Sequence, residues 1–364
     1  MDTSDPEIQF DHPSGRCSYC KLYDHRVRHD LFHGEERERK LAAIVAKVKA
    51  EGSGHEYDCL IGLSGGVDRT TAVWELKKRG LRPLAIHLDN GWNAELAVDN
   101  IKKVLDKLQI DLYTYVIDWE EFKDIQLSFL RASVPNSEIP TDHAIVCLHL
   151  KVALERNIRY MFIGANLATE AFMPVAWGYD PRDLKHLRAI HRRFGNVPLT
   201  TFPQLSVRTS LYAVLWRRIR WLSVLNYVSY DKQSAIEMLR QHFGYRPYGA
   251  KHFESVYTRF FQGYILPVKF GFNKKRAHLS SLVLSGGISR AQALEDMAKE
   301  DYVGTALCAE DREFVIKKLG LTEAEFEEIM RLPPRSHYHY PNNRLLFERM
   351  PWLFGRFKRL VTTV

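Results

Sequence analysis

The stretch that decides the fold is YDCLIGLSGGVDRTTAVWELKKRG, residues 57–80. Residues 57–63 are mostly apolar and alternate too little for a half-exposed strand, so they predict a strand buried on both faces of a parallel sheet. Residues 69–79 have helical spacing, and Gly80 is placed to cap the C-terminus of that helix. Five residues connect the strand to the helix: Ser64, Gly65, Gly66, Val67 and Asp68.

This connection has the features of a phosphate-binding loop. Gly65 and Gly66 can take positive φ and let backbone N–H groups approach an anion closely. The N-terminus of the following helix adds unpaired N–H groups and the positive end of its dipole, and Ser64 adds a hydroxyl. The stretch has neither the lysine of a P-loop nor the GxGxxG of a dinucleotide fold. The alternative is a plain turn in which Asp68 caps the helix.

Strands and helices alternate along the first half of the chain. Besides the first pair, the pattern predicts strands at 82–89, 111–118 and 159–166, and helices at 93–109, 119–131 and 141–157. This order predicts an α/β fold, with a mostly parallel sheet and helices on both faces. Ligands bind at the carboxyl ends of the strands in such sheets. The residues expected there are Ser64 to Asp68, His87 to Asn93, Asp118, and Gly164 to Glu170.

The pattern changes after about residue 175, where helices are predicted at 208–230, 231–243 and 250–266, followed by two or three shorter ones. The stretch LWRRIRWLSVL (215–225) interleaves Arg and Trp. It indicates a core helix with an arginine-covered face, or a helix that docks on a partner or a membrane surface. The expected parts are an N-terminal segment with a CxxC motif (1–50), an α/β domain (51–175), a mainly helical part (176–340) and a basic, apolar tail (341–364).

The composition is that of a globular protein. The chain has 364 residues, no apolar run that approaches the length of a membrane span, and no export signal at its start. Its five scattered cysteines do not look like a disulfide framework, so we expect a cytoplasmic location. The net charge of +8 suits an acidic partner but does not identify one.

The SGGVD loop resembles the PP-loop of ATP pyrophosphatases, which has the pattern SGGxDS and splits ATP between its α- and β-phosphates. Longer blocks, such as LAIHLDNGWNAELAVDNI and YDPRDLKHLRAIHRRFG, resemble the N-acetyl sugar amidotransferases, and the resemblance runs from about residue 2 to residue 340. That family converts an acetamido group on a nucleotide-activated or related bacterial sugar to an acetamidino group. Its products enter lipopolysaccharide O-antigen or flagellar glycans.

The resemblance implies an ATP-dependent amidotransferase. The acetamido oxygen is expected to attack the α-phosphate of ATP, after which ammonia displaces AMP. ATP and Mg²⁺ are the implied cofactors, and a nucleotide-sugar rather than a nucleic acid is the implied substrate. Cys59 in a strand, Cys147 in a helix and Cys308 in a loop are not placed as glutaminase nucleophiles. Ammonia is therefore expected from a separate glutaminase subunit, together with a cyclase-like protein that channels it.

The strand ends and the resemblance together select the candidate site residues. Those expected to act in catalysis are Asp68, His143, Glu170, Lys251 and His252. Those expected to bind ATP are Ser64, Gly65, Gly66, Val67, Asp68, Arg69, Thr70, Asp89, Asn90, Gly164 and Asn166. Those expected to bind the sugar are Thr141, Asp142, Arg259, Lys275 and Arg276. In the alternative interpretation Thr141 and Asp142 only cap a helix, and the basic residues only cover a solvated helix face.

Two departures from the family pattern bear on function. Arg69 stands where the PP-loop has Ser, so either Thr70 supplies a hydroxyl or Arg69 itself pairs with phosphate. The family's upstream Cys-x-x-Cys is absent, so Cys17 and Cys20 form half of a zinc site, which is empty or is completed by His25 or His29. Two other functions stay open: a PP-loop tRNA-modifying enzyme, and a non-catalytic scaffold with a degenerate loop.

Overall fold

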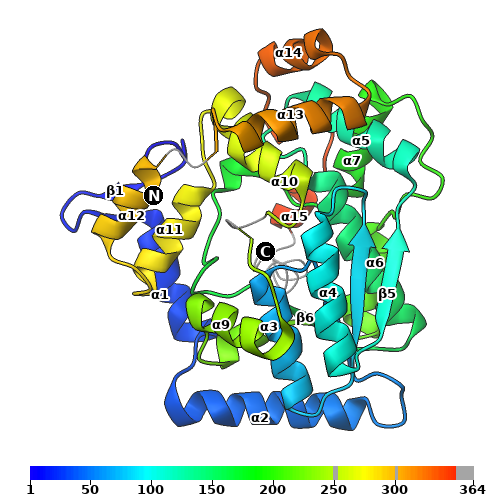
Figure 1. The fold of residues 1–364 in the computed structure, drawn as a ribbon, viewed down its shortest axis with the longest axis vertical. Coiled ribbons are helices and arrows are strands. Elements are labelled where there is room, and N and C mark those ends of the chain that lie inside the picture. The colour runs from blue at the N-terminus through cyan, green and yellow to red at the C-terminus, as the bar shows by residue number, and fades with distance from the viewer. Residues whose placement is uncertain (249–252, 300–301, 350–364) are drawn as a thin grey trace.

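The computed structural model describes residues 1–248, 253–299 and 302–349. Its centre is a sheet of five parallel strands in the order β5-β4-β3-β6-β7. Helices cover the sheet, and the C-terminal helices α10, α13 and α14 lie beyond the carboxyl ends of its strands (Figure 1). The predicted α/β fold is confirmed. The strands are β3 (Cys59–Gly62), β4 (Pro83–Asp89), β5 (Leu112–Val116), β6 (Tyr160–Ile163) and β7 (Arg220–Ser223).

Burial on both faces of the sheet explains the apolar sequence of β3. Cys59 and Ile61 belong to the core on one face, and Leu60 between them belongs to the core on the other. Successive side chains of a strand point to opposite faces, so a central parallel strand needs apolar residues at every position. The first core includes residues of α2 (Gly34–Glu51), α3 (Val67–Lys78), α4 (Glu95–Leu108) and α9 (Lys232–Phe243), and the second includes residues of α6 (Ile139–Glu155).

One predicted helix is wrong. Residues 208–230 form α8 (Val207–Leu211), a π-helical turn η2 (Tyr212–Trp216), the strand β7 and a short 3-10 helix η3 (Val224–Tyr227). Arg218 takes a left-handed φ of 55°, which ends the helical turn, and Arg220 N–H then donates to the Arg159 carbonyl at 2.8 Å. Residues 220–223 thus pair with the open edge of β6 and form a strand, although the spacing of apolar residues in this segment suits a helix equally well. The parallel sheet therefore continues past residue 175.

The C-terminal part is helical, as predicted. Its first residues lie beside the segment that follows β4. There Ala94 N–H donates to the Glu254 carbonyl and Val256 N–H donates to the Trp92 carbonyl, both at 2.9 Å. Cys308 lies in a helix of this part and not in a loop. The elements are α10 (Val256–Phe260), a π-helix η4 (Phe261–Phe270), α11 (Lys275–Leu284), α12 (Arg290–Ala298), α13 (Ala306–Leu319), α14 (Glu323–Arg331) and α15 (Arg344–Arg349).

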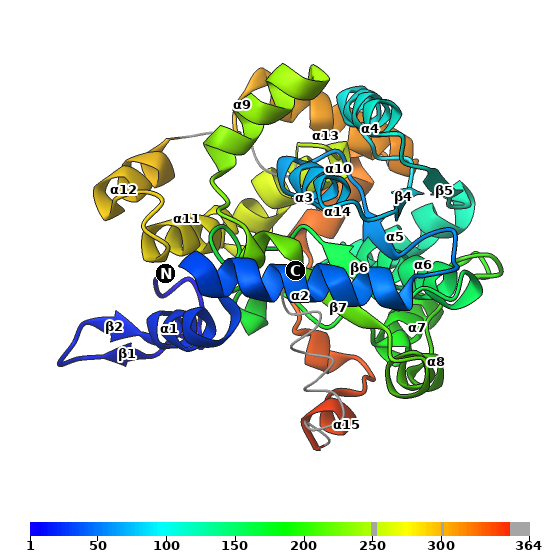
Figure 2. The same cartoon turned by 90° about the horizontal axis from the view of Figure 1, so that it is seen from below.

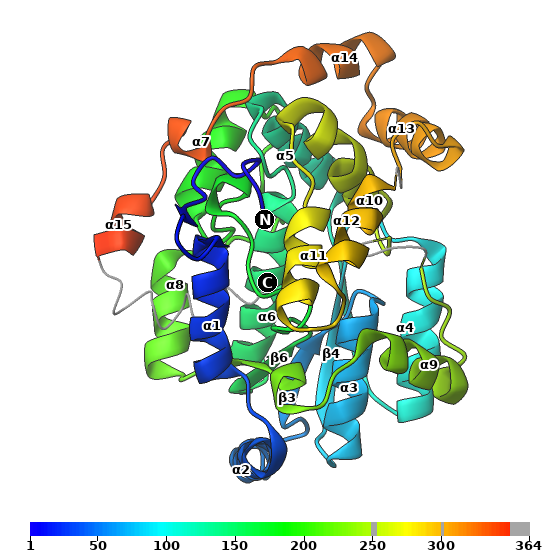
Figure 3. The same cartoon turned by 90° about the vertical axis from the view of Figure 1, so that its left-hand side faces the viewer.

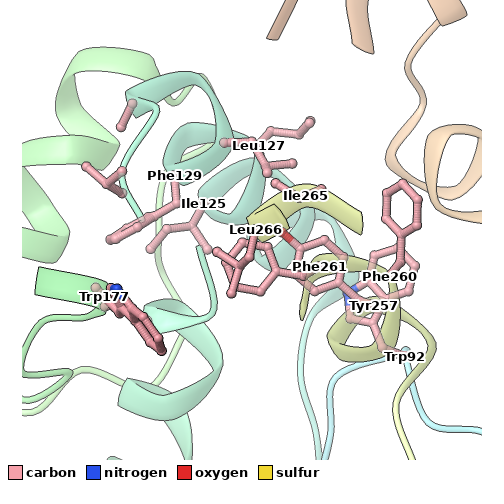
Figure 4. Close-up of a cluster of buried hydrophobic side chains, with 14 of the residues drawn as sticks. Trp92, Ile125, Leu127, Phe129, Trp177, Tyr257, Phe260, Phe261, Ile265 and Leu266 are labelled. Carbon is pink, nitrogen blue, oxygen red and sulfur yellow. The ribbon is translucent and has the colours of Figure 1, made fainter. Parts of the chain in front are cut away.

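A third core joins the helical part to the sheet domain. Trp92 packs against Tyr257 with ring centroids 5.2 Å apart, and its indole N–H donates to Gln126 at 2.8 Å. Figure 4 shows these two aromatic side chains beside Phe260 and Phe261, in the same buried cluster as Leu127 and Phe129. The large shared apolar surface holds the C-terminal part over the strand ends. The core includes residues of α5 (Trp119–Ala132) and α7 (Leu184–Phe194).

The N-terminal segment forms the hairpin β1 (Phe10–Asp11) and β2 (Arg16–Cys17), followed by α1 (Ser18–Asp30). Two short 3-10 helices, η1 (Val175–Trp177) and η5 (His337–His339), complete the described structure. None of the described helices has both the length and the apolar composition needed to cross a membrane.

Candidate active site

The glycine loop lies at the carboxyl end of β3, beside β6. The sheet order places β4 on one side of β3 and β6 on the other, so successive connections leave in opposite directions there. Such a switch point leaves a crevice, which is where open α/β sheets bind ligands. Gly65 takes a φ of 82°, whereas Gly66, with a φ of −69°, is the N-cap of α3. Only the first glycine therefore has the positive φ that was predicted for both.

The loop presents free backbone donors. Within the described residues, the N–H groups of Gly65 and Gly66 donate no hydrogen bond. A second Ser-Gly-Gly, residues 285–287, shows the contrast, because there Gly286 N–H donates to Val283 and Gly287 N–H donates to Leu282. Two unpaired N–H groups at a helix N-terminus favour an anion. The loop after β3 thus has the unpaired donors that suit an anion, whereas the N–H groups of the second Ser-Gly-Gly are used at the end of α11.

Two tyrosines from the segment after α9 hold the loop. The Gly65 carbonyl accepts hydrogen bonds from the Tyr245 hydroxyl at 2.9 Å and the Tyr248 hydroxyl at 3.1 Å. Anchoring this carbonyl fixes the direction of the neighbouring N–H groups. Nothing in the spacing of these tyrosines connects them with a loop 180 residues away, so the sequence does not predict this contact.

Asp68 and Thr70 point to different parts of the site. The Tyr230 hydroxyl donates to the Asp68 carboxylate, and burial together with Asp68 raises the pKa of that tyrosine. Glu170, from the segment after β6, lies close enough to add to this shift. The Thr70 hydroxyl donates to the Gly66 carbonyl at 2.8 Å and is buried. The Thr70 hydroxyl is thus engaged within α3, which favours the alternative in which Arg69 pairs with phosphate.

Arg69 crosses from α3 to the end of β6. A Cβ atom on Gly164 would lie 2.6 Å from Arg69 Cγ and 2.8 Å from Arg69 N, so the arginine needs a glycine at that position. The positive charge of Arg69 acts on Asp142 and on the buried His149, both in α6. The cation thus lies between the loop and α6, at the crevice.

Asp142 is an unusual carboxyl group. It stands in the first turn of α6, where burial and the neighbouring Glu138 raise its pKa to about 7, against the opposing charges of Lys274 and Arg69. A carboxyl group with a pKa near neutrality can act as a general base. Lys274 lies directly before α11, so the C-terminal part contributes to this cluster. The sequence placed Asp142 at the site but preferred Lys275 to Lys274.

His143 does not have the acid–base role that was predicted. Its Nδ1 contacts the Pro181 carbonyl at 2.6 Å, and its Nε2 accepts a hydrogen bond from Leu205 N–H at 3.0 Å. The ring is fully buried, and burial lowers its pKa to about 4. Both nitrogens are thus used to fasten loops to α6, which gives His143 a structural role.

Several buried histidines make stability sensitive to acid. The pKa values of His143, His149 and His186 are each lowered to about 4 by burial, while that of the half-buried Asp142 is raised. Between pH 6.5 and 4 the unfolded chain binds these histidine protons and the folded protein does not. The free energy of unfolding therefore decreases as the pH is lowered through this range. Each histidine contributes up to about 1.4 kcal/mol per pH unit, and Asp142 offsets one of them. Thermal unfolding should show a clearly lower Tm at pH 5 than at pH 7, and an unchanged Tm would contradict this.

The residues at the end of β4 have mainly structural contacts. The Asp89 carboxylate accepts from Gly91 N–H at 2.9 Å and from the Asn93 side chain at 3.1 Å, while the Asn90 side chain donates to the Thr141 hydroxyl at 3.3 Å. Asn90 thereby links the end of β4 to the first turn of α6. His87 is buried, with Nδ1 2.9 Å from the Leu63 carbonyl, in agreement with a core role.

Asn166 keeps one polar group unused. Its side-chain oxygen accepts from Thr169 N–H at 2.9 Å, but its buried Nδ2 has no hydrogen-bond partner among the described residues. Asn166 follows β6 and precedes Glu170, whose N–H donates to the Asn166 carbonyl at 3.0 Å. An unpaired buried donor at the strand ends fits a site that a ligand completes.

The basic residues predicted to bind the sugar are mostly engaged elsewhere. Arg259 forms a bidentate ion pair with the buried Asp311, with both distances 2.6 Å, and its role is therefore structural. Lys275 donates to the Asp296 carbonyl at 2.6 Å, and Arg276 pairs with Asp2. Lys251 and His252 lie outside the described residues.

The zinc site is not supported. The Sγ atoms of Cys17 and Cys20 lie 3.6 Å apart, and the rings of His25 and His29 are tilted by 55° with their centroids 4.5 Å apart. Among the residues that the structure describes, no three His, Cys, Asp or Glu side chains are grouped to hold a metal ion. The alternative in which His25 or His29 completes the motif is therefore not supported by the described residues.

Residues 254–354 match the family model described as LPS biosynthesis protein WbpG-like, C-terminal domain. The helical part that covers the strand ends is therefore similar to this WbpG-like domain. This agrees with the resemblance to proteins of lipopolysaccharide biosynthesis. The match begins at Glu254, the residue whose carbonyl fastens this part beside β4.

The chain is also similar to individual proteins. An uncharacterized protein of Methanocaldococcus jannaschii is 32% identical over 92 residues, and the match covers 25% of this chain and 32% of that protein. The NH3-dependent NAD synthetase of Campylobacter jejuni is 12% identical with a TM-score of 0.33, and the match covers 79% of this chain and 97% of the synthetase. The U34-tRNA thiolase NcsA of Methanococcus maripaludis is 13% identical with a TM-score of 0.31, and the match covers 77% of this chain and 90% of the thiolase.

Proposed function

We propose that this protein is an ATP-dependent amidotransferase that converts an acetamido group of a nucleotide-linked sugar to an acetamidino group. The observation that carries the proposal is the pair of unpaired N–H groups of Gly65 and Gly66 at the start of α3. The WbpG-like match of residues 254–354 supports a place in lipopolysaccharide O-antigen or related glycan biosynthesis. The PP-loop pattern of residues 64–68 supports ATP as the phosphate compound.

The proposed chemistry solves the poor reactivity of an amide. The acetamido oxygen attacks the α-phosphorus of ATP, a P–O bond forms, and pyrophosphate leaves into the loop. Asp142 accepts the proton that the amide nitrogen loses in this step. Ammonia then adds to the activated carbon, and AMP leaves with the former carbonyl oxygen. The product amidinium keeps all three hydrogens of ammonia.

The charges around the crevice suit this reaction. Arg69 and Lys274 act on Asp142 from α3 and from the start of α11, and both would neutralise phosphate charge. Arg69 thus replaces the hydroxyl of the PP-loop pattern by a cation. Electrostatic positioning of this kind contributes more to phosphoryl and nucleotidyl transfer than covalent chemistry by the protein does.

The loop also has carboxylates that suit a metal–nucleotide complex. Asp68 stands in the first turn of α3, and a Glu254 oxygen lies 3.4 Å from the position that a Cβ atom on Gly66 would take. Magnesium is a hard cation that prefers oxygen ligands, usually one or two carboxylates with phosphate oxygens. Asp68 and Glu254 would hold Mg²⁺ here, and the ion would offset the charge of the phosphates.

Ammonia is proposed to come from a partner. Cys59 and Cys147 are buried in the sheet domain, and burial raises the pKa of both thiols, which opposes a nucleophilic thiolate. Cys308 is likewise buried in α13. A separate glutaminase, with a cyclase-like channel protein, would then supply the nitrogen.

The test is a reaction mixture of protein, ATP, Mg²⁺ and ammonium with a panel of UDP- and CMP-linked N-acetyl sugars. We expect AMP to form only when both ammonium and the correct sugar are present, and we expect the sugar to gain an amidine by mass spectrometry. Glutamine alone should not replace ammonium. AMP formation that depends on tRNA, or turnover that appears only in an Arg69→Ser variant, would contradict the proposal.

A further inference from the structure

The π-helical turn η2 carries exposed apolar side chains. The Trp216 side chain is 74% exposed, and Tyr212 and Leu215 on the same turn are also exposed. Large apolar side chains grouped on one surface turn are unusual in a protein that stays free in solution. The sequence predicts this stretch as a core helix or as a helix that docks on a partner or a membrane surface. Part of it forms the strand β7 instead, which buries Trp221, while Trp216 stays exposed.

The turn is held in place and is not a loose loop. Arg217 N–H donates to the Tyr212 carbonyl at 3.1 Å, and Ile219 N–H donates to the Ala213 carbonyl at 3.0 Å. Between them Arg218 takes a φ of 55°, a conformation that costs a non-glycine residue on the order of 1 kcal/mol. The Arg217 side chain also contacts Asn157, which ties the turn to the end of α6.

Cations surround the apolar turn. Arg208, Arg218 and Arg220 are all exposed beside it, and no acidic residue occurs in the sequence between 207 and 220. A tryptophan flanked by arginines is typical of segments that lie in the headgroup region of a membrane, where the indole suits the interface and the guanidinium groups suit anionic lipids.

A second segment of the same character lies on the same side of the molecule. The helix α15 exposes Leu345, with 64% of its side chain accessible, and Leu346, beside the exposed Arg349. Figures 2 and 3 both place α8 and α15 on one side, away from α9 and α13. Two separate apolar and basic elements on one side can touch a flat surface together.

We propose that η2, with the help of α15, docks this protein on a membrane surface that contains anionic phospholipids. The occupant is chosen by charge, because exposed arginines flank the apolar side chains and no carboxylate of residues 207–220 opposes them. The proposal does not depend on the chemistry of the glycine loop, which lies at the strand ends. The protein binds peripherally, with Trp216 and Leu215 in the headgroup layer.

The experiment is co-sedimentation of the full chain with vesicles of phosphatidylglycerol and phosphatidylcholine, compared with vesicles of phosphatidylcholine alone. We expect binding to the anionic vesicles that weakens as salt is raised. The double variant Leu215→Ser with Trp216→Ser should reduce the partition coefficient about a hundredfold, which is about tenfold for each apolar side chain withdrawn. The control is Leu294→Ser in α12, which removes a side chain that is 61% exposed on another part of the surface and should bind like the natural protein.

Three results would overturn the proposal. The first is an absence of sedimentation with anionic vesicles, and the second is equal binding to neutral vesicles. The third is a concentration-dependent dimer, detected by ultracentrifugation, that the double variant abolishes, because it would show that a second copy covers this turn. Circular dichroism shows whether a variant that no longer binds vesicles is still folded.

Discussion

Replacing Gly65 by alanine should strongly weaken ATP binding. Gly65 has a φ of 82°, and a Cβ atom there would lie 2.8 Å from both the Ala97 carbonyl oxygen and the Tyr248 hydroxyl. The first contact is with backbone, so the loop itself must move and its N–H groups lose their direction. We expect the affinity for Mg-ATP, measured by calorimetry, to fall by about a hundredfold, which corresponds to about 3 kcal/mol.

The control for this variant is Gly286→Ala. Gly286 belongs to the second Ser-Gly-Gly and has a φ of 76°, but a Cβ atom there would meet nothing within 4 Å. The substitution carries the same left-handed strain without touching the loop after β3. It should reduce Tm slightly and leave the affinity for Mg-ATP unchanged. Equal affinities in the two variants would mean that the loop does not bind the nucleotide.

Replacing Asp142 by asparagine should remove the reaction but not the nucleotide. The variant keeps the shape of the side chain and removes the base, so we expect kcat to fall by about a hundredfold or more. In the natural protein the base must be ionised, so kcat/KM should rise with pH around the Asp142 pKa of about 7. This rise should be absent from any residual activity of the variant.

The thermal stability of the Asp142→Asn variant shows whether a lower kcat comes from loss of the base or from unfolding. A carboxyl group whose pKa is raised by folding destabilises the folded state progressively as pH rises from its unfolded to its folded pKa, and the full cost remains above the folded pKa. Asp142→Asn should therefore raise Tm at pH 8.5. The matched control is Asp99→Asn, which removes an exposed carboxylate of α4 and should leave kcat unchanged. An Asp142→Asn enzyme with normal kcat would show that another group takes the proton.

The sequence predicted the sheet domain well because its signals are local. The apolar run before Ser64 and the alternation of strands with helices follow directly from burial on two faces. The placement of Gly65, Asp68 and Asp142 at the strand ends followed from the topology of parallel sheets. The need for a glycine at position 164 comes from its contact with Arg69, which is 95 positions away in the sequence. No local sequence pattern predicts that contact.

The failures have a common physical cause, which is competition between partners far apart in the sequence. His143 has the residue type of a catalyst, but the Pro181 carbonyl and Leu205 N–H take both of its nitrogens. Arg259 lies in a basic stretch, but the buried Asp311 takes its guanidinium. The segment 208–230 has helical spacing, yet pairing with β6 makes part of it a strand. Local periodicity carries no information about such partners.

The most direct test of the central claim follows the oxygen of the acetamido group. The substrate sugar is prepared with oxygen-18 in its acetamido carbonyl and is turned over with ATP and ammonium. Attack of that oxygen on the α-phosphorus predicts that the label appears in AMP. Label in inorganic phosphate or retained in the sugar, with ATP cleaved at another bond, would contradict the account.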